Sequence, residues 1–271
     1  MIKNMVKFGN SKTLLLRSGK TNLMVKKEEA FIFYATFIAD EYKLLNIREN
    51  DIVIDFGANI GDFTVKVGRL LHNTGKIIAI EPNHNNVEIL KKNLELNNIK
   101  NVYIIECAIT DKNGYSYLKG DDVGAEVSDI EGGTRVKTIS IENLLDILDH
   151  PKNVVVKMDI EGGEKYIFTN DEFVDSVREI AVELHGKENI GTIPKILEAN
   201  NFIIRKYETK DEIKNTIKFA LLHPLSFIRA EKLSGYIAIN GAISTLKNKT
   251  NPIPSINNDE LEVIYACRRD K

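Results

Sequence analysis

The feature that most constrains this fold is a series of short apolar runs separated by amphipathic stretches. Residues 52–56, 77–81 and 102–107 read as buried strands, and residues 62–71 and 83–96 between them read as helices. Strands of nearly continuous apolar character that alternate with helices are typical of a parallel sheet covered on both faces. We therefore predict a doubly wound, Rossmann-like α/β fold with a mostly parallel sheet.

The same alternation returns later, after an irregular stretch. Two segments, 115–118 and 134–138, are predicted to pair as a hairpin because turn residues lie between them. Further strands are predicted at 153–160, 179–184, 202–207 and 261–267, and helices at 141–148, 164–170 and 193–199.

The chain is predicted to carry an extension before the main domain and an insertion within it. Residues 1–45 form the extension: two short strands around the turn at 17–20, then one helix over 28–45. Residues 46–271 form the domain, with an insertion at about 208–258 before the last strand. The insertion is basic and partly apolar, which fits a lid, an amphipathic surface for a partner or membrane, or a helix with a solvated basic face.

Composition limits the location and partners of the protein. Of 271 residues, 43% are apolar, enough for a substantial core, and the net charge of -2 gives no general attraction to nucleic acid or anionic membrane. The most apolar early segment, 30–39, is too short and too closely flanked by charges to span a bilayer. Cys107 and Cys267 lie in apolar runs and are expected to be buried free thiols. We expect a cytoplasmic protein without a transmembrane segment.

A glycine turn, Asp55-x-Gly57-x-Asn59-x-Gly61, follows the first core strand. Open α/β sheets bind ligands at the carboxyl ends of their strands, and glycine allows close approach of the backbone. The helix that follows offers free N–H groups at its first turn. An ordinary tight strand-to-helix connection has the same composition, so the turn alone supports either interpretation.

Glu81 favours a nucleoside ligand. It ends the next strand, where an acidic side chain accepts hydrogen bonds from ribose hydroxyls. Dinucleotide sites use the spacing G-x-G-x-x-G, which Gly57, Asn59 and Gly61 do not match. Asp55 and Asn59 suit the amino and carboxylate groups of a methionine moiety, as in S-adenosylmethionine (SAM), better than a pyrophosphate.

At this point the sequence resembles the FkbM-type SAM-dependent methyltransferases. Residues 52–64 are similar to the first motif of the family, and the other matching segments follow in order: 80–83, Leu90-x-x-Asn93 with Asn97, 108–114, the K-x-D-x-E-G-x-E signature at 157–164, and 182–185. The resemblance implies a class I methyltransferase fold, which has a seven-stranded sheet with the last strand antiparallel. It also implies methyl transfer from SAM, usually to oxygen. The acidic loop 121–126 and residues 206–258 depart from the family where an acceptor would be selected.

The acidic signature suggests the chemistry. Methyl transfer to a hydroxyl requires loss of its proton, so Asp159, and then Glu161, are the candidate general bases. Alternatively, Glu161 and Glu164 only cap the next helix. A metal site of Asp159, Glu161, Glu183 and His185 is a third interpretation, although we assign no metal from the sequence. His185 is interpreted as a substrate contact.

We therefore predict a SAM-dependent O-methyltransferase that acts on a small molecule, glycan or lipid, with no nucleic-acid acceptor. N-methylation of RNA or protein is disfavoured because D-I-E-G replaces the Asn/Asp-Pro-Pro-aromatic motif, and a non-catalytic SAM-binding module is a further alternative. The predicted catalytic residues are Asp159 and Glu161, and the predicted cofactor residues are Asp55, Gly57, Asn59 and Gly61 (methionine end), Glu81 and Asn83 (ribose), and Glu106 and Ala108 (adenine).

Overall fold

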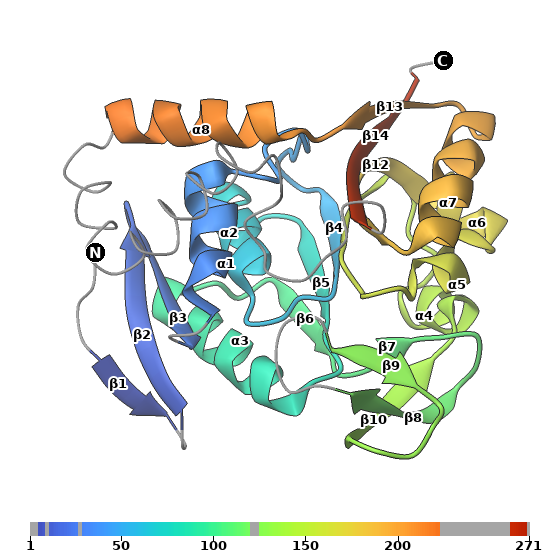
Figure 1. Ribbon diagram of the computed structural model, residues 1–271, viewed down its shortest axis with the longest axis horizontal. Helices are drawn as coiled ribbons and strands as arrows, with labels where there is room; N and C mark the ends of the chain where they lie inside the picture. The colour runs from blue at the N-terminus through green and yellow to red at the C-terminus, as the bar shows by residue number, and fades with distance from the viewer. Residues whose placement is uncertain (1–4, 9–10, 27–28, 120–124, 223–260, 270–271) are drawn as a thin grey trace.

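A seven-stranded sheet forms the centre of the protein in the computed structural model, which describes residues 5–8, 11–26, 29–119, 125–222 and 261–269 (Figure 1). All neighbouring strands pair parallel except β14, which is antiparallel to both β12 and β13. This confirms the predicted mostly parallel sheet and its antiparallel last strand. The order across the sheet is β13 (Phe202–Lys206), β14 (Leu261–Arg268), β12 (Val177–His185), β11 (Val154–Met158), β4 (Ile52–Phe56), β5 (Lys76–Ile80) and β6 (Val102–Ile105).

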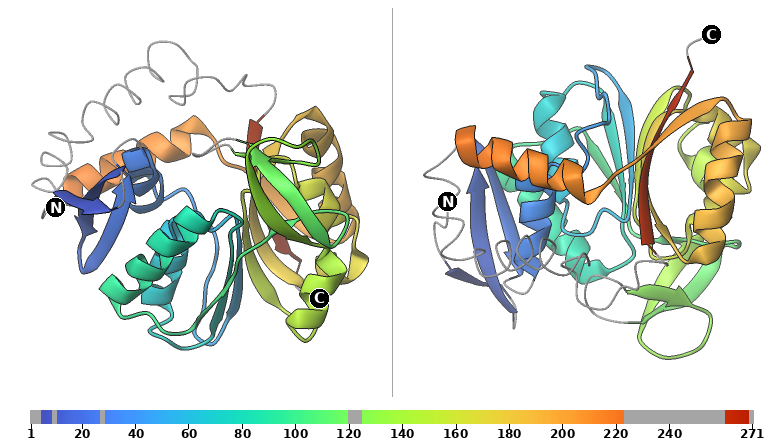
Figure 2. Two further views of the ribbon diagram at one scale, coloured as in Figure 1. Left: turned by 90° about the horizontal axis from the view of Figure 1, so that it is seen from below. Right: turned by 45° about the horizontal axis from the view of Figure 1, so that its top comes forward.

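Helices cover both faces of the sheet (Figure 2). On one face, Ile54 and Ile78 pack into a core with residues of α4 (Ile141–Ile147), α6 (Asp171–Ser176) and α7 (Lys187–Ala199). On the other face, Val53 and Ile77 pack against α2 (Asp62–Leu70), and Ala79 lies in the same core as residues of α3 (His84–Asn97). Alternate residues of one strand thus serve opposite cores, which explains why the strand sequences are apolar throughout.

A smaller four-stranded sheet lies between β6 and α4 along the chain. Its order is β7 (Ala108–Ile109), β10 (Thr134–Ile139), β8 (Gly114–Lys119) and β9 (Glu126–Ser128). The predicted hairpin is confirmed, since β8 and β10 pair antiparallel with Leu118 opposite Thr134. Figure 1 shows this sheet next to the lower end of the central sheet, where β4 and β5 lead into their loops.

The N-terminal strands form a third sheet, β1 (Met5–Phe8), β2 (Ser11–Ser18) and β3 (Thr21–Lys26), which contains the predicted turn. The predicted helix over 28–45 is confirmed only over residues 30–39 of the described part of that range. The chain forms α1 (Ala30–Tyr34) and a π-helical segment, η2 (Ala35–Ala39), which ends at Asp40 with φ of 55°. Lys66 donates to the Thr36 carbonyl and the Asp40 carboxylate, so contacts with α2 stabilise this early end.

The start of the predicted insertion is helix α8 (Thr209–Leu222), which lies across η2 (Figure 1). Tyr34 shares a hydrogen bond of 2.8 Å with Thr216, and Lys43 donates to Asn215 at 3.0 Å. Residues 223–258 of the insertion lie outside the described residues. No helix in the described part of the chain is long and apolar enough to cross a membrane.

The two cysteines differ in their environment. Cys107 is buried and carries a free thiol, as predicted. The prediction for Cys267 is wrong, since this thiol is exposed near the end of β14, where Ala266 takes the buried side of the strand.

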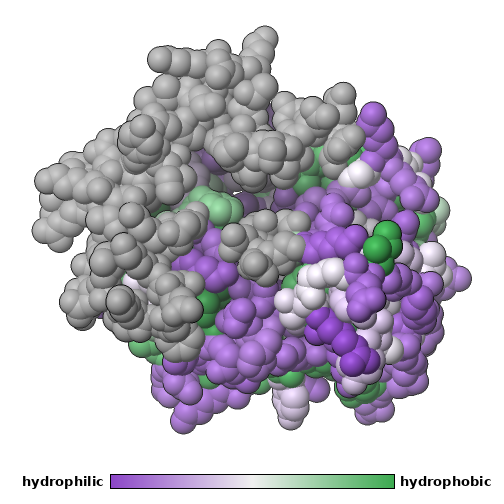
Figure 3. All heavy atoms as spheres, turned by 60° about the horizontal axis from the view of Figure 1, so that its bottom comes forward, coloured by the Kyte–Doolittle hydropathy of each residue, from purple (hydrophilic) through white to green (hydrophobic). Residues whose placement is uncertain are grey.

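Over the described residues, the face shown in Figure 3 is mainly hydrophilic with scattered apolar side chains.

Candidate active site

One cavity of about 690 Å³ opens at the carboxyl ends of β4, β5, β11 and β12, with the small sheet as a side wall. Its size is in the range of small-molecule and cofactor sites. Most of the predicted site residues line it: Gly57, Asn59, Glu81, Asn83, Ala108, Asp159, Glu161 and His185. Asp55, Gly61 and Glu106 do not line it. The fold therefore brings residues more than a hundred positions apart to one space.

Gly57 lets the turn lie directly on the end of β11. Its φ is +73°, and a Cβ here would stand only 1.8 Å from the Asp159 carbonyl oxygen. The Gly57 and Ala58 N–H groups donate to the Ile80 carbonyl at 3.0 and 2.9 Å. Any larger residue at position 57 would separate the turn from both neighbouring strands.

Glu81 links the glycine turn to the second strand end. Its carboxylate accepts from the Asn59 N–H at 2.8 Å and the Asn83 N–H at 2.9 Å. Burial raises the pKa of Glu81, although these hydrogen bonds act in the opposite direction. The side chain is only 5% exposed and lines the cavity, so the carboxylate is held in place to receive further donors from a ligand.

Asp55 lies beneath the turn. It is fully buried, accepts from the Thr64 hydroxyl at 2.6 Å and stands 3.3 Å from the Lys157 ammonium. Lys157 donates in turn to the Gly57 carbonyl at 2.6 Å. Burial disfavours the charged amine, but nearby carboxylates, Asp55 first, raise the pKa of Lys157. Asp55 thus supports the turn through Lys157. Sequence reasoning gave Lys157 no role, although Lys157 begins the K-x-D-x-E-G-x-E signature and is a lysine in an otherwise apolar strand.

Two asparagines that line the cavity carry buried amide oxygens without donors in the described part of the chain. The Oδ1 atoms of Asn59 and Asn86 are buried and make no hydrogen bond with the described residues. A buried acceptor without a partner costs free energy, which a bound donor recovers. Together with Glu81, these acceptors fit the hydroxyl and amino donors of a nucleoside with an amino-acid tail, which is the chemistry of SAM.

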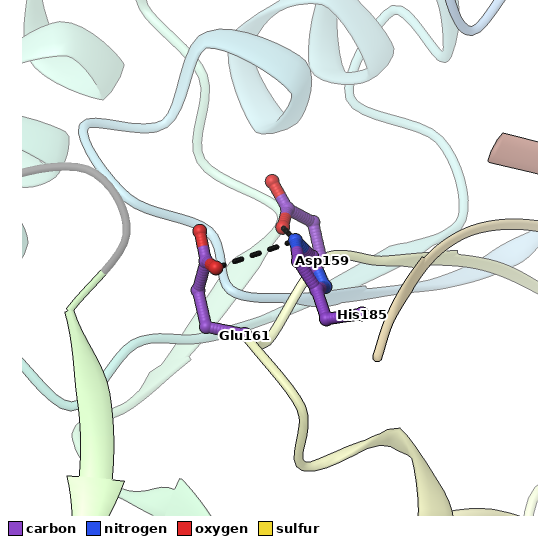
Figure 4. A group of neighbouring side chains, drawn as sticks. All are labelled: Asp159, Glu161 and His185. Atoms are coloured by element: carbon purple, nitrogen blue, oxygen red, sulfur yellow. Dashed lines mark ion pairs between the residues drawn. The ribbon is translucent and has the colours of Figure 1, made fainter. Parts of the chain in front are cut away.

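Asp159, Glu161 and His185 meet at the other side of the cavity (Figure 4). The His185 Nε2 atom stands 3.3 Å from a Glu161 oxygen and 3.9 Å from an Asp159 oxygen. Glu183 is 3.9 Å from the same nitrogen. Asp159, Glu161 and His185 each offer one ligand atom within 4.8 Å of the others, so they can hold a metal ion or relay a proton.

Glu164 fixes the orientation of His185. It is fully buried at the start of α5 (Glu164–Phe168), and its carboxylate lies 2.8 Å from His185 Nδ1 and 2.6 Å from the Asn189 amide nitrogen. It therefore does more than cap a helix. Sequence reasoning missed this role, although Glu164 belongs to the K-x-D-x-E-G-x-E signature.

The clustered charges shift the titration of their neighbours. Burial disfavours the imidazolium form of His185, but the Glu164 hydrogen bond and the carboxylates of Asp159, Glu161 and Glu183 outweigh it and raise its pKa to about 10. Burial is the main cause that raises the pKa of Glu161 to about 7. A carboxylate that titrates near neutral pH can exchange a proton with a bound ligand.

Glu106 points away from the cavity. Its carboxylate is 42% exposed and lies 3.0 Å from His84 Nδ1. The next two residues, Cys107 and Ala108, line the cavity instead. The small sheet adds apolar side chains to the wall, among them Leu118 and Val127.

The known proteins that this chain resembles are methyltransferases. Residues 55–204 match the model of the Methyltransferase FkbM domain. Methyltransferase 1 of Beauveria bassiana is 24% identical over 211 residues, which is 68% of this chain and 84% of that protein. Methyltransferase sdnD of Sordaria araneosa is 26% identical over 220 residues, 67% of this chain and 85% of that protein. The hexuronic acid methyltransferase AglP of Haloferax volcanii is 26% identical over 154 residues, 55% of this chain and 62% of that protein.

Proposed function

Because the chain belongs to the FkbM methyltransferase family, we propose that it transfers the methyl group of SAM to a hydroxyl oxygen of a small molecule, glycan or lipid. The observation that carries this proposal is that one cavity joins two different surfaces. One surface, around Glu81 and Asn59, presents nucleoside acceptors, and the other presents the carboxylates of Asp159 and Glu161. A donor and an acceptor molecule bound to these surfaces would meet within the cavity.

SAM supplies an electrophilic methyl group on a sulfonium. The residues that would hold its methionine end are those of the glycine turn, supported from below by Asp55 and Lys157. Glu81 and Asn83 would hold the ribose, and Ala108 would flank the adenine. Asn59 and Asn86 support this assignment because both line the cavity and carry amide oxygens without a donor among the described residues, which a ligand donor would satisfy.

The acceptor must orient its hydroxyl and lose a proton. Asp159 and Glu161 are the candidates to receive that proton, because both line the cavity beside His185. A Glu161 pKa of about 7 supports this role, since proton transfer is most efficient when the pKa of the base is near the operating pH. His185 would contact the acceptor, held in position by Glu164.

The polar floor of the cavity favours a hydroxylated acceptor such as a sugar. Carboxylates accept hydrogen bonds from several hydroxyl groups at once. The similarity to the hexuronic acid methyltransferase AglP is in accord with this class. The apolar wall residues Leu118 and Val127 would contact a less polar part of the acceptor.

The proposal is tested by product analysis. The full chain is incubated with methyl-labelled SAM and panels of sugars, glycolipids and small hydroxylated molecules, and mass spectrometry follows S-adenosylhomocysteine and the methylated product. We expect an O-methylated product, with kcat lowered about 10²–10⁴-fold in Asp159→Asn and SAM affinity retained. Asp146→Asn changes an exposed carboxylate of α4 that lies outside the cavity and is the control, with kcat expected to be unchanged. A product methylated only on nitrogen, or no S-adenosylhomocysteine with any acceptor class, would contradict the proposal.

A further inference from the structure

Asp159, Glu161 and His185 each offer a donor atom within 4.8 Å of the others, close enough for one metal ion to draw them together. We infer that these three side chains bind a divalent cation next to the acceptor, an inference that rests on the proposed function. Metal–ligand bonds of about 2.0–2.2 Å place adjacent ligand atoms about 3 Å apart. His185 Nε2 already stands 3.3 Å from Glu161 and 3.9 Å from Asp159, so small side-chain movements suffice.

The orientation of His185 is independent support. A histidine that binds a metal through one nitrogen nearly always donates the other N–H to a carboxylate or carbonyl, which fixes its tautomer. Here the fully buried Glu164 stands 2.8 Å from Nδ1, and Asn189 holds the second oxygen of Glu164. Nε2 makes no hydrogen bond with any described residue and faces carboxylate oxygens (Figure 4).

The charge balance also favours a cation. The carboxylates of Asp159, Glu161, Glu164 and Glu183 surround one imidazole. The buried Lys157 ammonium is directed to Asp55 and to the carbonyls of the glycine turn. Four carboxylates around one imidazole leave excess negative charge even when the imidazole is protonated, and a divalent cation in place of that proton would offset more of it.

The ligand set indicates the kind of cation. Two carboxylates and one imidazole suit a metal that accepts both oxygen and nitrogen ligands, and they leave coordination positions open to the cavity. Mn²⁺ meets these conditions and is a spectroscopic probe. Such a cation would make a nearby acceptor hydroxyl more acidic, so that its proton would pass to water and its oxygen would keep the electron pair for attack on the methyl carbon. With the cation bound, Asp159 and Glu161 would act on the acceptor through the cation, and water would replace them as the proton acceptor of the proposed function.

Direct metal binding tests the inference. The full chain is stripped with EDTA and titrated with MnCl₂, and free Mn²⁺ is followed by electron paramagnetic resonance. We expect one tightly bound Mn²⁺ per chain. Asp159→Asn removes a ligand and Glu164→Gln releases the histidine ring, so each should weaken Mn²⁺ binding by at least about 10-fold. Asp111→Asn removes an exposed carboxylate of the cavity wall outside the cluster and should leave Mn²⁺ binding unchanged.

Two further measurements separate this inference from the proposed function. SAM titration of each variant shows that its fold and donor site are retained. Methyl transfer that is lost in EDTA and restored by Mn²⁺ would support the cation. Absence of Mn²⁺ binding, or equal binding by the wild type, Asp159→Asn and Asp111→Asn, would overturn it. Undiminished O-methylation in EDTA would also overturn it while leaving the proposed function intact.

Discussion

At the scale of single residues, the site depends on side chains that act through others. Asp55 holds Lys157, and Lys157 holds the Gly57 carbonyl. Glu164 likewise holds His185. In both cases a buried carboxylate fixes a basic side chain. Lys157 then positions the glycine turn, and His185 itself faces the cavity. Such residues influence ligand binding without contact with the ligand.

Glu81 is the residue whose change tests the donor site. In Glu81→Gln the side chain loses its charge and one of its two acceptor oxygens, both of which now receive backbone N–H groups. Because hydrogen bonds to charged groups are worth about 1.5–3 kcal/mol, we expect SAM to bind about 10–100-fold more weakly by isothermal titration. Glu106→Gln, at the next strand end but outside the cavity, is the control and should change affinity less than about 2-fold. Equal effects of the two variants would count against the ribose assignment.

At the scale of elements, α3 connects the N-terminal sheet to the glycine turn. The Asn93 amide pairs with both the N–H and the carbonyl of Met24 in β3, at 2.6 and 2.9 Å, and also donates to the Ile60 carbonyl at 2.8 Å. One turn along the helix, Asn97 pairs in the same way with Asn22. The two amides thus pair with the backbone of β3 as a neighbouring strand would.

Asn93 and Asn97 therefore both support β3, but only Asn93 also contacts the glycine turn. Asn93→Ala and Asn97→Ala should each lower the free energy of unfolding by about 1–3 kcal/mol in urea denaturation, because backbone groups of β3 lose their partners. Asn93→Ala alone should also weaken SAM binding, since only Asn93 supports Ile60 in the turn. If Asn97→Ala weakened SAM binding as much, α3 would affect the site through general destabilisation.

The elements that were predicted most accurately are those determined by a local pattern of apolar residues. The strands β4, β5 and β11 were clear because buried parallel strands are apolar along their whole length. The helix predicted over 28–45 ends at Ala39 in the structure, because contacts of Lys66 with Thr36 and Asp40 stabilise this early end. The turn and the strand-end acids were visible in sequence, whereas the roles of Lys157 and Glu164 depend on partners that only the fold brings near.

At the scale of the whole molecule, burial changes the titration of several acids. Burial is the main cause that raises the pKa values of four acids: Glu41 to about 8, Asp62 to about 6, Glu161 to about 7, and Glu183 well above its usual range. An acid whose pKa is higher in the folded than in the unfolded chain makes the fold less stable as pH rises between the two values. These four acids should therefore make the free protein less stable as the solution moves from acidic to neutral pH.

Asp62 allows this pH dependence to be isolated. It is 8% exposed, and its pKa rises from 3.8 to about 6, so its destabilisation develops between pH 3.8 and 6 and is complete at pH 7. The shift corresponds to about 3 kcal/mol. In urea denaturation, Asp62→Asn should resemble the wild type at pH 4 and exceed its stability at pH 7 by up to that amount. The exposed Asp111→Asn should show no such difference, and a constant offset of Asp62→Asn at both pH values would contradict the explanation.

The central claim is that one cavity binds SAM at the glycine turn and presents its methyl group to the cluster of Asp159, Glu161 and His185. A crystal structure with bound S-adenosylhomocysteine tests it most directly, through the distance between the ribose hydroxyls and the Glu81 carboxylate. We predict hydrogen-bond distances there, the methionine end at residues 57–61, and the sulfur facing Asp159 and Glu161. Ribose hydroxyls beyond hydrogen-bond reach of Glu81, or a ligand bound outside this cavity, would contradict the account.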